Sequence, residues 1–299
     1  MLILIRWLSR RSLRLLHACG GALGWAAYAL SPAYRQRLRA NAALAGVGVA
    51  ERRASVAEAG RLVLELPRLW LRPADRAIAD PVHWDGAALL ETLLGNGRGL
   101  VLLTPHLGSF EVAAQAYAER FGARQPLTVL YRPARQAWLR ELEASARARP
   151  ALATAAATLA GVRSMIRALR RGETVGLLPD QVPPDGLGVW APFFGQPAYT
   201  MTLAARLVQQ TGAAVGVLWC ERLPQGAGYV VHAMQLPESL PAAAERSAGN
   251  GVDSTSEEAL VQASALAINR SMETIIRLKP TQYLWGYNRY KLPRQQRVG

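Results

Sequence analysis

Cysteine, lysine and histidine are all scarce in this chain of 299 residues. Its two cysteines, Cys19 and Cys220, are too few for a disulfide framework, which favours a reducing compartment. The four histidines, at positions 17, 83, 106 and 232, lack the spacing of metal ligands, so we expect no metal site. Helix-turn-helix patterns and interleaved basic and aromatic residues are also missing. The sequence therefore argues against a metalloenzyme and against a nucleic-acid-binding protein.

Acidic residues are absent from the first 50 positions, which hold seven arginines. Among them, residues 15–30 are uncharged, a segment shorter than the roughly 20 apolar residues that a membrane-spanning helix needs. Together with residues 1–7 it predicts a long amphipathic helix that dips into one membrane leaflet. We expect a membrane anchor with a basic flank over residues 1–45, and a main domain over residues 46–299. A cleaved signal peptide and an ordinary buried helix are the alternatives.

The whole chain is basic. Thirty-five basic residues against 21 acidic ones give a net charge of +14, and all but two of the basic residues are arginine. Arginine is suited to bidentate recognition of phosphate and carboxylate groups. The charge indicates an anionic partner, which could be phospholipid, nucleic acid or an acidic carrier protein. Because nucleic-acid motifs are missing, phospholipid and an acidic carrier protein stay open as partners.

Short uncharged segments alternate with helical patterns along the chain. Strands are predicted at residues 100–104, 127–131 and 174–178, with helices at residues 110–121, 134–149 and 161–171. This alternation predicts an α/β fold with a mixed, largely parallel sheet flanked by helices. Further elements are expected as follows: strands at 82–84, 189–194, 213–220 and 229–234, a helix capped by Thr200 that runs to Gln210, and a loop at 239–256.

The stretch GLVLLTPHLGSFE, residues 99–111, places polar side chains where a predicted strand ends and a helix begins. His106 follows the strand, at the rim where open α/β sheets bind ligands. We expect Glu111, in the first turn of the helix, to accept a hydrogen bond from Nδ1 of His106 and leave Nε2 free as a base. Ser109 is interpreted as the helix cap rather than a nucleophile. The alternative is a structural histidine beside a solvent-facing glutamate.

Six motifs together resemble the late lipid A acyltransferases, the lauroyl and myristoyl transferases of Gram-negative bacteria, within the glycerolipid acyltransferase superfamily. They span nearly the whole chain: HLGSFE from His106 to Glu111, YRP at 131–133, Gly161-Val-Arg163, LLPDQ ending at Gln181, FFG at 193–195 with Thr200, and YLWGYNRYK ending at Lys291. The resemblance implies a bacterial inner-membrane enzyme whose catalytic domain, residues 46–299, faces the cytoplasm. Such an enzyme transfers a fatty acyl chain from acyl carrier protein to a hydroxyl of a lipid A precursor, an anionic glycolipid. It needs no cofactor beyond the carrier thioester.

The resemblance also implies catalytic roles. His106 would be the general base and Glu111 its orienting acid, and the hydroxyl would attack the thioester directly, without an acyl-enzyme. Backbone N–H groups near Gly108, or the guanidinium of Arg163, would stabilise the oxyanion of the tetrahedral intermediate.

Substrate binding is expected from four residues. Arg132 and Arg163 would bind phosphates of the acceptor, and Asp180 and Gln181 match an Asp-Gln pair of the family. In this interpretation Asp180 would hold an arginine or shape the pocket. An acyltransferase acting on a lysophospholipid, on glycerol phosphate or on another glycolipid is the nearest alternative, because the histidine-acid pair is shared across the superfamily. A basic membrane-surface scaffold would explain the charge without an enzyme.

Overall fold

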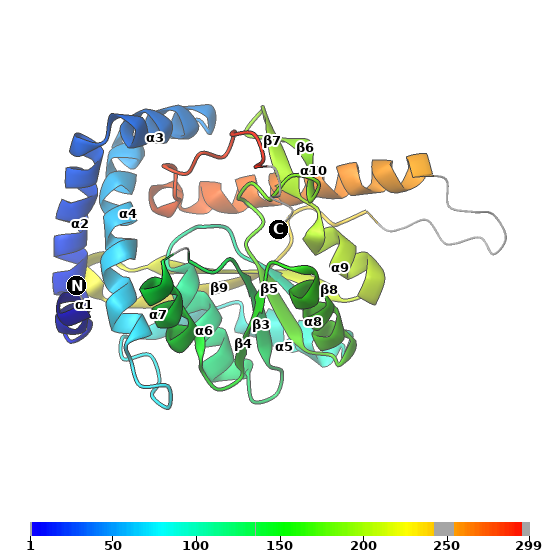
Figure 1. The fold of residues 1–299 in the computed structure, drawn as a ribbon, viewed down its shortest axis with the longest axis horizontal. Coiled ribbons are helices and arrows are strands. Elements are labelled where there is room, and N and C mark those ends of the chain that lie inside the picture. The colour runs from blue at the N-terminus through cyan, green and yellow to red at the C-terminus, as the bar shows by residue number, and fades with distance from the viewer. Residues whose placement is uncertain (1, 135, 242–253, 295–299) are drawn as a thin grey trace.

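A seven-stranded sheet lies at the centre of the computed structural model, which describes residues 2–134, 136–241 and 254–294 (Figure 1). The strand order is β1-β9-β8-β2-β5-β3-β4. Neighbouring strands are parallel except β8 and β9, which are antiparallel. The prediction of a mixed, largely parallel sheet is therefore confirmed. The strands are β1 (Val82–Asp85), β2 (Leu100–Leu103), β3 (Leu127–Tyr131), β4 (Leu152–Ala156), β5 (Thr174–Leu177), β8 (Ala214–Arg222) and β9 (Tyr229–Gln235).

Helices cover both faces of this sheet (Figure 1). They are α1 (Leu2–Ser9), α2 (Leu13–Leu30), α3 (Pro32–Leu44), α4 (Val49–Trp70), α5 (Ala87–Gly95), α6 (Phe110–Phe121), α7 (Ala137–Arg147), α8 (Leu159–Arg170), α9 (Leu203–Thr211) and α10 (Ser254–Leu278). On β2, Leu100 and Leu102 join the core formed with α5 and α6, whereas Val101 and Leu103 join the core formed with α8, α9 and α10. The uncharged run LVLL is thus a strand buried on both faces.

One strand was not predicted, and one predicted helix cap is wrong. The segment Leu152–Ala156 forms β4 beside β3, which was not expected because alanine has little strand preference. Thr200 does not cap a helix: it lies in β7 (Gln196–Met201), which pairs with β6 (Gly188–Phe193) in a separate antiparallel hairpin. Its buried hydroxyl accepts hydrogen bonds from Asn269 and Arg289, and α9 begins only at Leu203. Of the loop predicted at 239–256, residues 242–253 lie outside the described residues.

The N-terminal region contains separate helices rather than one long helix. Helix α1 ends at Ser9 and α2 begins at Leu13. Ser12 caps α2 by accepting a hydrogen bond from the N–H of Leu15. Helix α2 then lies along α4 (Figure 1). The approach is so close that a Cβ on Gly60 would lie 2.0 Å from the carbonyl oxygen of Gly20. Within residues 2–134, 136–241 and 254–294, no helix is long and apolar enough to cross a membrane. The domain boundary at residue 45 stays a prediction.

Candidate active site

His106 and Asp180 form the centre of the site. His106 follows the carboxyl end of β2, and Asp180 follows that of β5, the neighbouring parallel strand. Nδ1 of the imidazole lies 2.7 Å from Oδ1 of Asp180, and the backbone N–H of His106 donates to Oδ2 at 2.9 Å. Both oxygens of one carboxylate thus hold the same residue. This arrangement orients the imidazole and leaves Nε2 outside the hydrogen bond with Asp180.

Asp180 remains a carboxylate in spite of its burial. Its side chain is 1% exposed, and burial alone acts to raise its pKa. The imidazole of His106, its hydrogen bonds and the guanidinium of Arg289 act in the opposite direction and hold the pKa of Asp180 below its ordinary value. An ionised Asp180 can only accept, so Nδ1 of His106 carries the hydrogen and Nε2 of the neutral ring carries the lone pair.

The prediction that Glu111 holds Nδ1 of His106 is wrong. Asp180 occupies that position from the adjacent strand, whereas Glu111 accepts a hydrogen bond from Arg147 of α7 at 2.5 Å. Burial acts to lower the pKa of Arg147, but the interactions with Glu111, Glu143 and Tyr131 together outweigh it and raise that pKa above its ordinary value. Glu111 therefore forms an ion pair with Arg147, and whether it takes part in catalysis stays a prediction.

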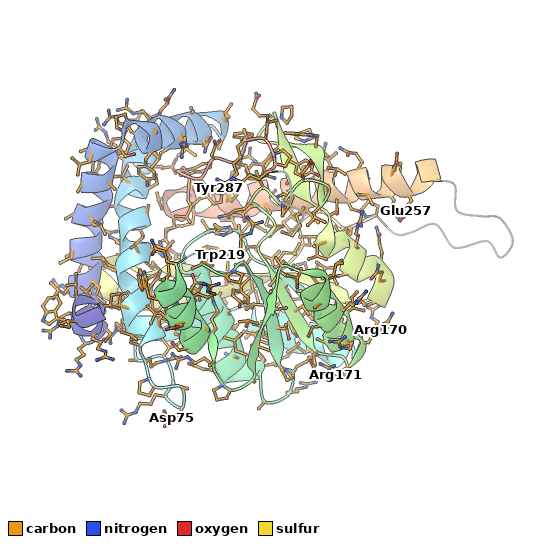
Figure 2. All side chains as sticks on the ribbon, in the orientation of Figure 1. Asp75, Arg170, Arg171, Trp219, Glu257 and Tyr287 are labelled. Carbon is orange, nitrogen blue, oxygen red and sulfur yellow. The ribbon has the colours of Figure 1, made fainter. Side chains whose placement is uncertain are left out.

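A cavity of about 390 Å³ opens beside the imidazole. The ring of Phe110 packs edge-to-face on that of His106, with 5.1 Å between the ring centroids. Figure 2 labels Tyr287, which belongs to the C-terminal segment and lines the cavity. Arg132 and Gln181 line it too, whereas Asp180 is not among the lining residues and contacts His106, which is. Substrate binding by these residues stays a prediction. The polar lining residues are His106, Glu111, Tyr131, Arg132, Arg147, Gln181, Tyr287 and Lys291.

Gly108 does not supply a free backbone donor. Its N–H donates to the carbonyl oxygen of Gln282 at 3.0 Å, so this particular N–H is not available to an oxyanion, and a role for the other backbone N–H groups near Gly108 stays a prediction. The C-terminal segment pairs with the His106 turn in two further places, through the Leu107–Tyr283 bridge and a hydrogen bond from the N–H of Leu284 to the carbonyl oxygen of His106. Glycine is needed at this turn because φ is +61° and a Cβ would lie 1.9 Å from the carbonyl oxygen of Cys220.

Ser109 precedes α6 but does not cap it with its side chain. Its hydroxyl donates to Glu65 of α4 at 2.5 Å, and the residue is fully buried. The same carboxylate accepts hydrogen bonds from His17, Arg222 and Tyr229. Ser109 thus holds the N-cap position as predicted, but its side chain makes no capping hydrogen bond. The buried hydroxyl instead binds a carboxylate that connects α2, α4 and β8 to the turn after β2.

Arg163 is not brought to the cavity. It lies on the exposed side of α8 and is absent from the cavity lining. The cations that do line the cavity beside Arg132 are Arg147 and Lys291. The sequence contains a signal that Lys291 belongs to the site, because this residue ends the YLWGYNRYK motif. It contains no such signal for Arg147, because nothing distinguishes that residue from the other arginines of its helix.

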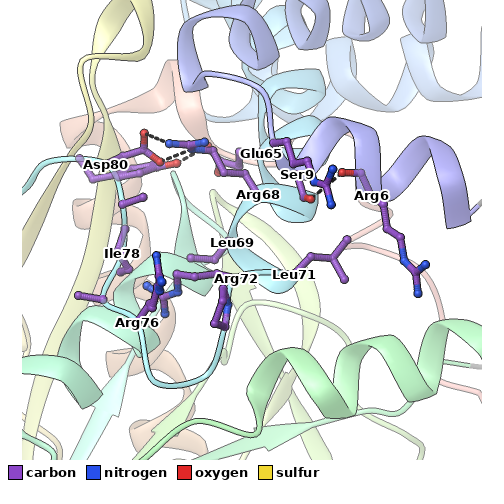
Figure 3. A pocket seen from close by; sticks show the side chains of 15 residues that line it. Arg6, Ser9, Glu65, Arg68, Leu69, Leu71, Arg72, Arg76, Ile78 and Asp80 are labelled. Atoms are coloured by element: carbon purple, nitrogen blue, oxygen red, sulfur yellow. Dashed lines mark hydrogen bonds and ion pairs between the residues drawn. The ribbon is translucent and has the colours of Figure 1, made fainter.

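A second cavity, of about 500 Å³, lies between α1, the end of α4 and the loop before β1 (Figure 3). Five arginines line it: Arg6, Arg10, Arg68, Arg72 and Arg76. Asp80 is paired with Arg68 through both carboxylate oxygens, at 2.7 and 3.0 Å. Glu65, the other carboxylate in the lining, is already held by four donors. Because its lining includes no histidine, this cavity lacks a neutral-pH base, and the His106 cavity is the better candidate.

Comparison with known proteins identifies one family. Residues 1–292 match a family model described as bacterial lipid A biosynthesis acyltransferase. The chain is 26% identical to the lipid A biosynthesis lauroyltransferase of Escherichia coli (strain K12) over 233 residues, which cover 78% of this chain and 69% of the relative. It is 25% identical to the palmitoleoyltransferase of the same organism and to a lipid A biosynthesis acyltransferase of Shigella flexneri, in each case over 78% of this chain and 68% of the relative.

Proposed function

The chain belongs to the bacterial lipid A biosynthesis acyltransferases, and we propose that it transfers a fatty acyl chain from acyl carrier protein to a hydroxyl of a lipid A precursor. The observation that carries the mechanism is the pair formed by Nδ1 of His106 and the carboxylate of Asp180. This pair supports general-base catalysis at Nε2, beside a cavity wide enough for a substrate.

The reaction proceeds by direct transfer. Nε2 of His106 takes the proton of the acceptor hydroxyl while the hydroxyl oxygen attacks the carbonyl carbon of the thioester. The tetrahedral intermediate then collapses, the carbon–sulfur bond breaks, and the imidazolium returns its proton to the leaving thiolate. Asp180 stabilises the imidazolium and fixes the tautomer, as the carboxylate does in hydrolase triads. No acyl-enzyme is needed, and the burial of Ser109 against Glu65 supports this order of events.

Cations on the cavity wall bind the anionic acceptor. Arg132 at the end of β3 and Lys291 in the C-terminal segment are placed to meet phosphate groups of a lipid A precursor. Arg147 is held in a fixed position by Glu111, which acts here as a positioning residue. The oxyanion receives its stabilisation from the positive end of α6, whose first turn follows the catalytic turn.

The enzyme works at the cytoplasmic face of the inner membrane. Helix α1 exposes large apolar side chains beside arginines: Ile3 is 85% exposed, Leu4 58% and Trp7 50%. Such a surface fits the interface between lipid headgroups and acyl chains, where apolar side chains enter the bilayer and arginines meet anionic lipid.

A donor and acceptor matrix tests the function. Purified full-length protein is incubated with an acyl thioester of acyl carrier protein or of coenzyme A, and with a lipid A precursor, a lysophospholipid or glycerol phosphate. We expect one added acyl group on the lipid A precursor, detected by mass spectrometry, and faster transfer from the carrier protein. Transfer to a lysophospholipid alone would overturn the acceptor, and equal rates from both thioesters would overturn the preference for the carrier.

A further inference from the structure

An apolar groove of about 440 Å³ lies between α2, α4 and the C-terminal segment. Its wall contains Leu23 and Ala27 from α2, and Ala59 and Val63 from α4. No lining residue is charged, and apart from Gln181 and two tyrosines every one is apolar or glycine. A groove of this size and composition is suited to a hydrocarbon chain.

The groove and the His106 cavity share two wall residues, Gln181 and Tyr287. The hydroxyl of Tyr287 accepts a hydrogen bond from the N–H of Val182, which fixes the two shared residues relative to each other. Leu284, on the groove side, donates its backbone N–H to the carbonyl oxygen of His106. The wall of the groove is therefore built on the same backbone as the catalytic turn.

Close backbone packing gives the groove a rigid shape. A Cβ on Gly24 would lie 2.1 Å from the carbonyl oxygen of Val56, so α2 and α4 are in contact beneath the lining side chains. At the C-terminal side, a Cβ on Gly286 would lie 2.0 Å from the ring of Tyr34. Since these walls cannot move inward, the side chains that project into the groove determine how much chain it holds.

We propose that this groove binds the acyl chain of the donor thioester, and that Ala27, Ala59 and Val63 set the chain length the enzyme accepts. The proposal rests on the acyl transfer proposed above. With the thioester carbonyl beside Nε2 of His106, the chain passes Gln181 and Tyr287 and lies between α2 and α4. The donor chain is the occupant because the cavity on the other side of these two residues carries Arg132 and Lys291, which suit the anionic acceptor.

Bulky replacements in the groove test the proposal. Ala59→Phe and Ala27→Phe are compared with Ala54→Phe and Ala22→Phe, which alter exposed positions of the same two helices outside both cavities. Carrier-protein donors from octanoyl to palmitoyl compete for one acceptor, and product ratios are read by mass spectrometry. We expect the groove variants to lower the ratio of kcat/KM for long over short donors by at least about tenfold, because a filled pocket rejects extra methylenes. The controls should keep the wild-type ratio.

Three results would overturn the groove as the donor site: an unchanged ratio in both groove variants, an equal loss for every chain length, or a raised KM for the acceptor alone. Transfer to the lipid A precursor by the wild-type protein upholds the proposed function, whatever effect the groove variants have on the ratio of long to short donors. If the wild type transfers nothing, a donor with a photoreactive diazirine at the end of its acyl chain shows where that chain binds. Cross-linking to residues 23–27 or 59–63 supports the groove, whereas cross-linking confined to residues 129–157 of the other cavity overturns it.

Discussion

His106 and Asp180 occupy matched positions on two adjacent parallel strands. β2 and β5 pair Leu103 with Leu177, and each functional side chain lies three residues beyond its member of that pair. The pairing across the sheet, rather than closeness in sequence, brings the base and its carboxylate together. A carboxylate 74 positions away holds the imidazole, while Glu111, only five positions from His106, binds Arg147.

Replacing Asp180 should slow the chemical step. In Asp180→Asn the carboxylate no longer stabilises the imidazolium or fixes the tautomer, so we expect kcat to fall by about 10²- to 10⁴-fold, with a smaller change in KM. His106→Ala should lose activity to at least the same extent. Steady-state kinetics at several pH values measure both variants, and circular dichroism verifies that they are folded. An Asp180→Asn enzyme within about threefold of wild type would remove Asp180 as the partner of the base.

Glu111 should behave differently from Asp180. Glu111→Gln removes a charge-assisted hydrogen bond to Arg147, worth about 1.5–3 kcal/mol, so we expect KM for the acceptor to rise about tenfold. The pH profile of kcat should stay that of the wild type, because His106 keeps its own carboxylate. If the acidic limb of that profile moves in Glu111→Gln and not in Asp180→Asn, Glu111 is the partner of the base and the assignment above fails.

Local patterns predicted the sheet and the position of the base. The uncharged run that forms β2, followed by Pro105 and His106, predicts the imidazole at the correct edge of the sheet. The partner of His106 was missed because strand order is a property of the whole fold. Had β2 and β5 been assumed neighbours, the equal spacing of His106 and Asp180 from the ends of their strands would have indicated the pair.

Contacts with the C-terminal segment could not be predicted in the same way. The backbone N–H of Gly108 looked free because nothing nearby in sequence accepts from it, yet Gln282 does so. Arg163 was expected at the site from its motif, but its side of α8 faces solvent. Both errors concern tertiary packing, which amino-acid patterns within one segment do not determine.

Glu65 should be important for stability although it lies outside the His106 cavity. Its side chain is 1% exposed and accepts from Ser109, His17, Arg222 and Tyr229. Glu65→Gln leaves Arg222 with only one of its two carboxylate partners, so the free energy of unfolding should fall by about 3 kcal/mol. Urea denaturation measures the change. A loss below about 1 kcal/mol would mean that the remaining partners compensate.

Ser109→Ala provides the matched comparison within this network. It removes one hydrogen bond to Glu65 and should cost about 1–2 kcal/mol of unfolding free energy. Because the hydroxyl takes no part in the proposed chemistry, the variant should keep most of its kcat. Detection of an acyl group on Ser109 during turnover would contradict direct transfer.

Asp180 should also make stability depend on pH. Its pKa is lower in the folded protein than in the unfolded chain, so the ionised carboxylate stabilises the fold above the unfolded value of about 3.9. That contribution is lost as the pH falls through the lowered folded pKa. We therefore expect the gap in unfolding free energy between wild type and Asp180→Asn to narrow below about pH 4. Urea titrations across this range measure the gap, and a constant gap would show that the pKa of Asp180 is not lowered by folding.

The exposed apolar face of α1 should bind lipid bilayers. Ile3, which is 85% exposed, would enter the bilayer, and transfer of such a side chain out of water contributes about 1.5–3 kcal/mol. Ile3→Asp should therefore weaken binding to vesicles that contain anionic phospholipid by about tenfold or more, as measured by co-sedimentation. Leu159, 78% exposed on α8 at another part of the surface, gives the control Leu159→Asp, which should bind like wild type. Equal binding by all three proteins would exclude α1 as the membrane contact. Equal weakening in both variants would indicate a general effect of added negative charge rather than a specific apolar face.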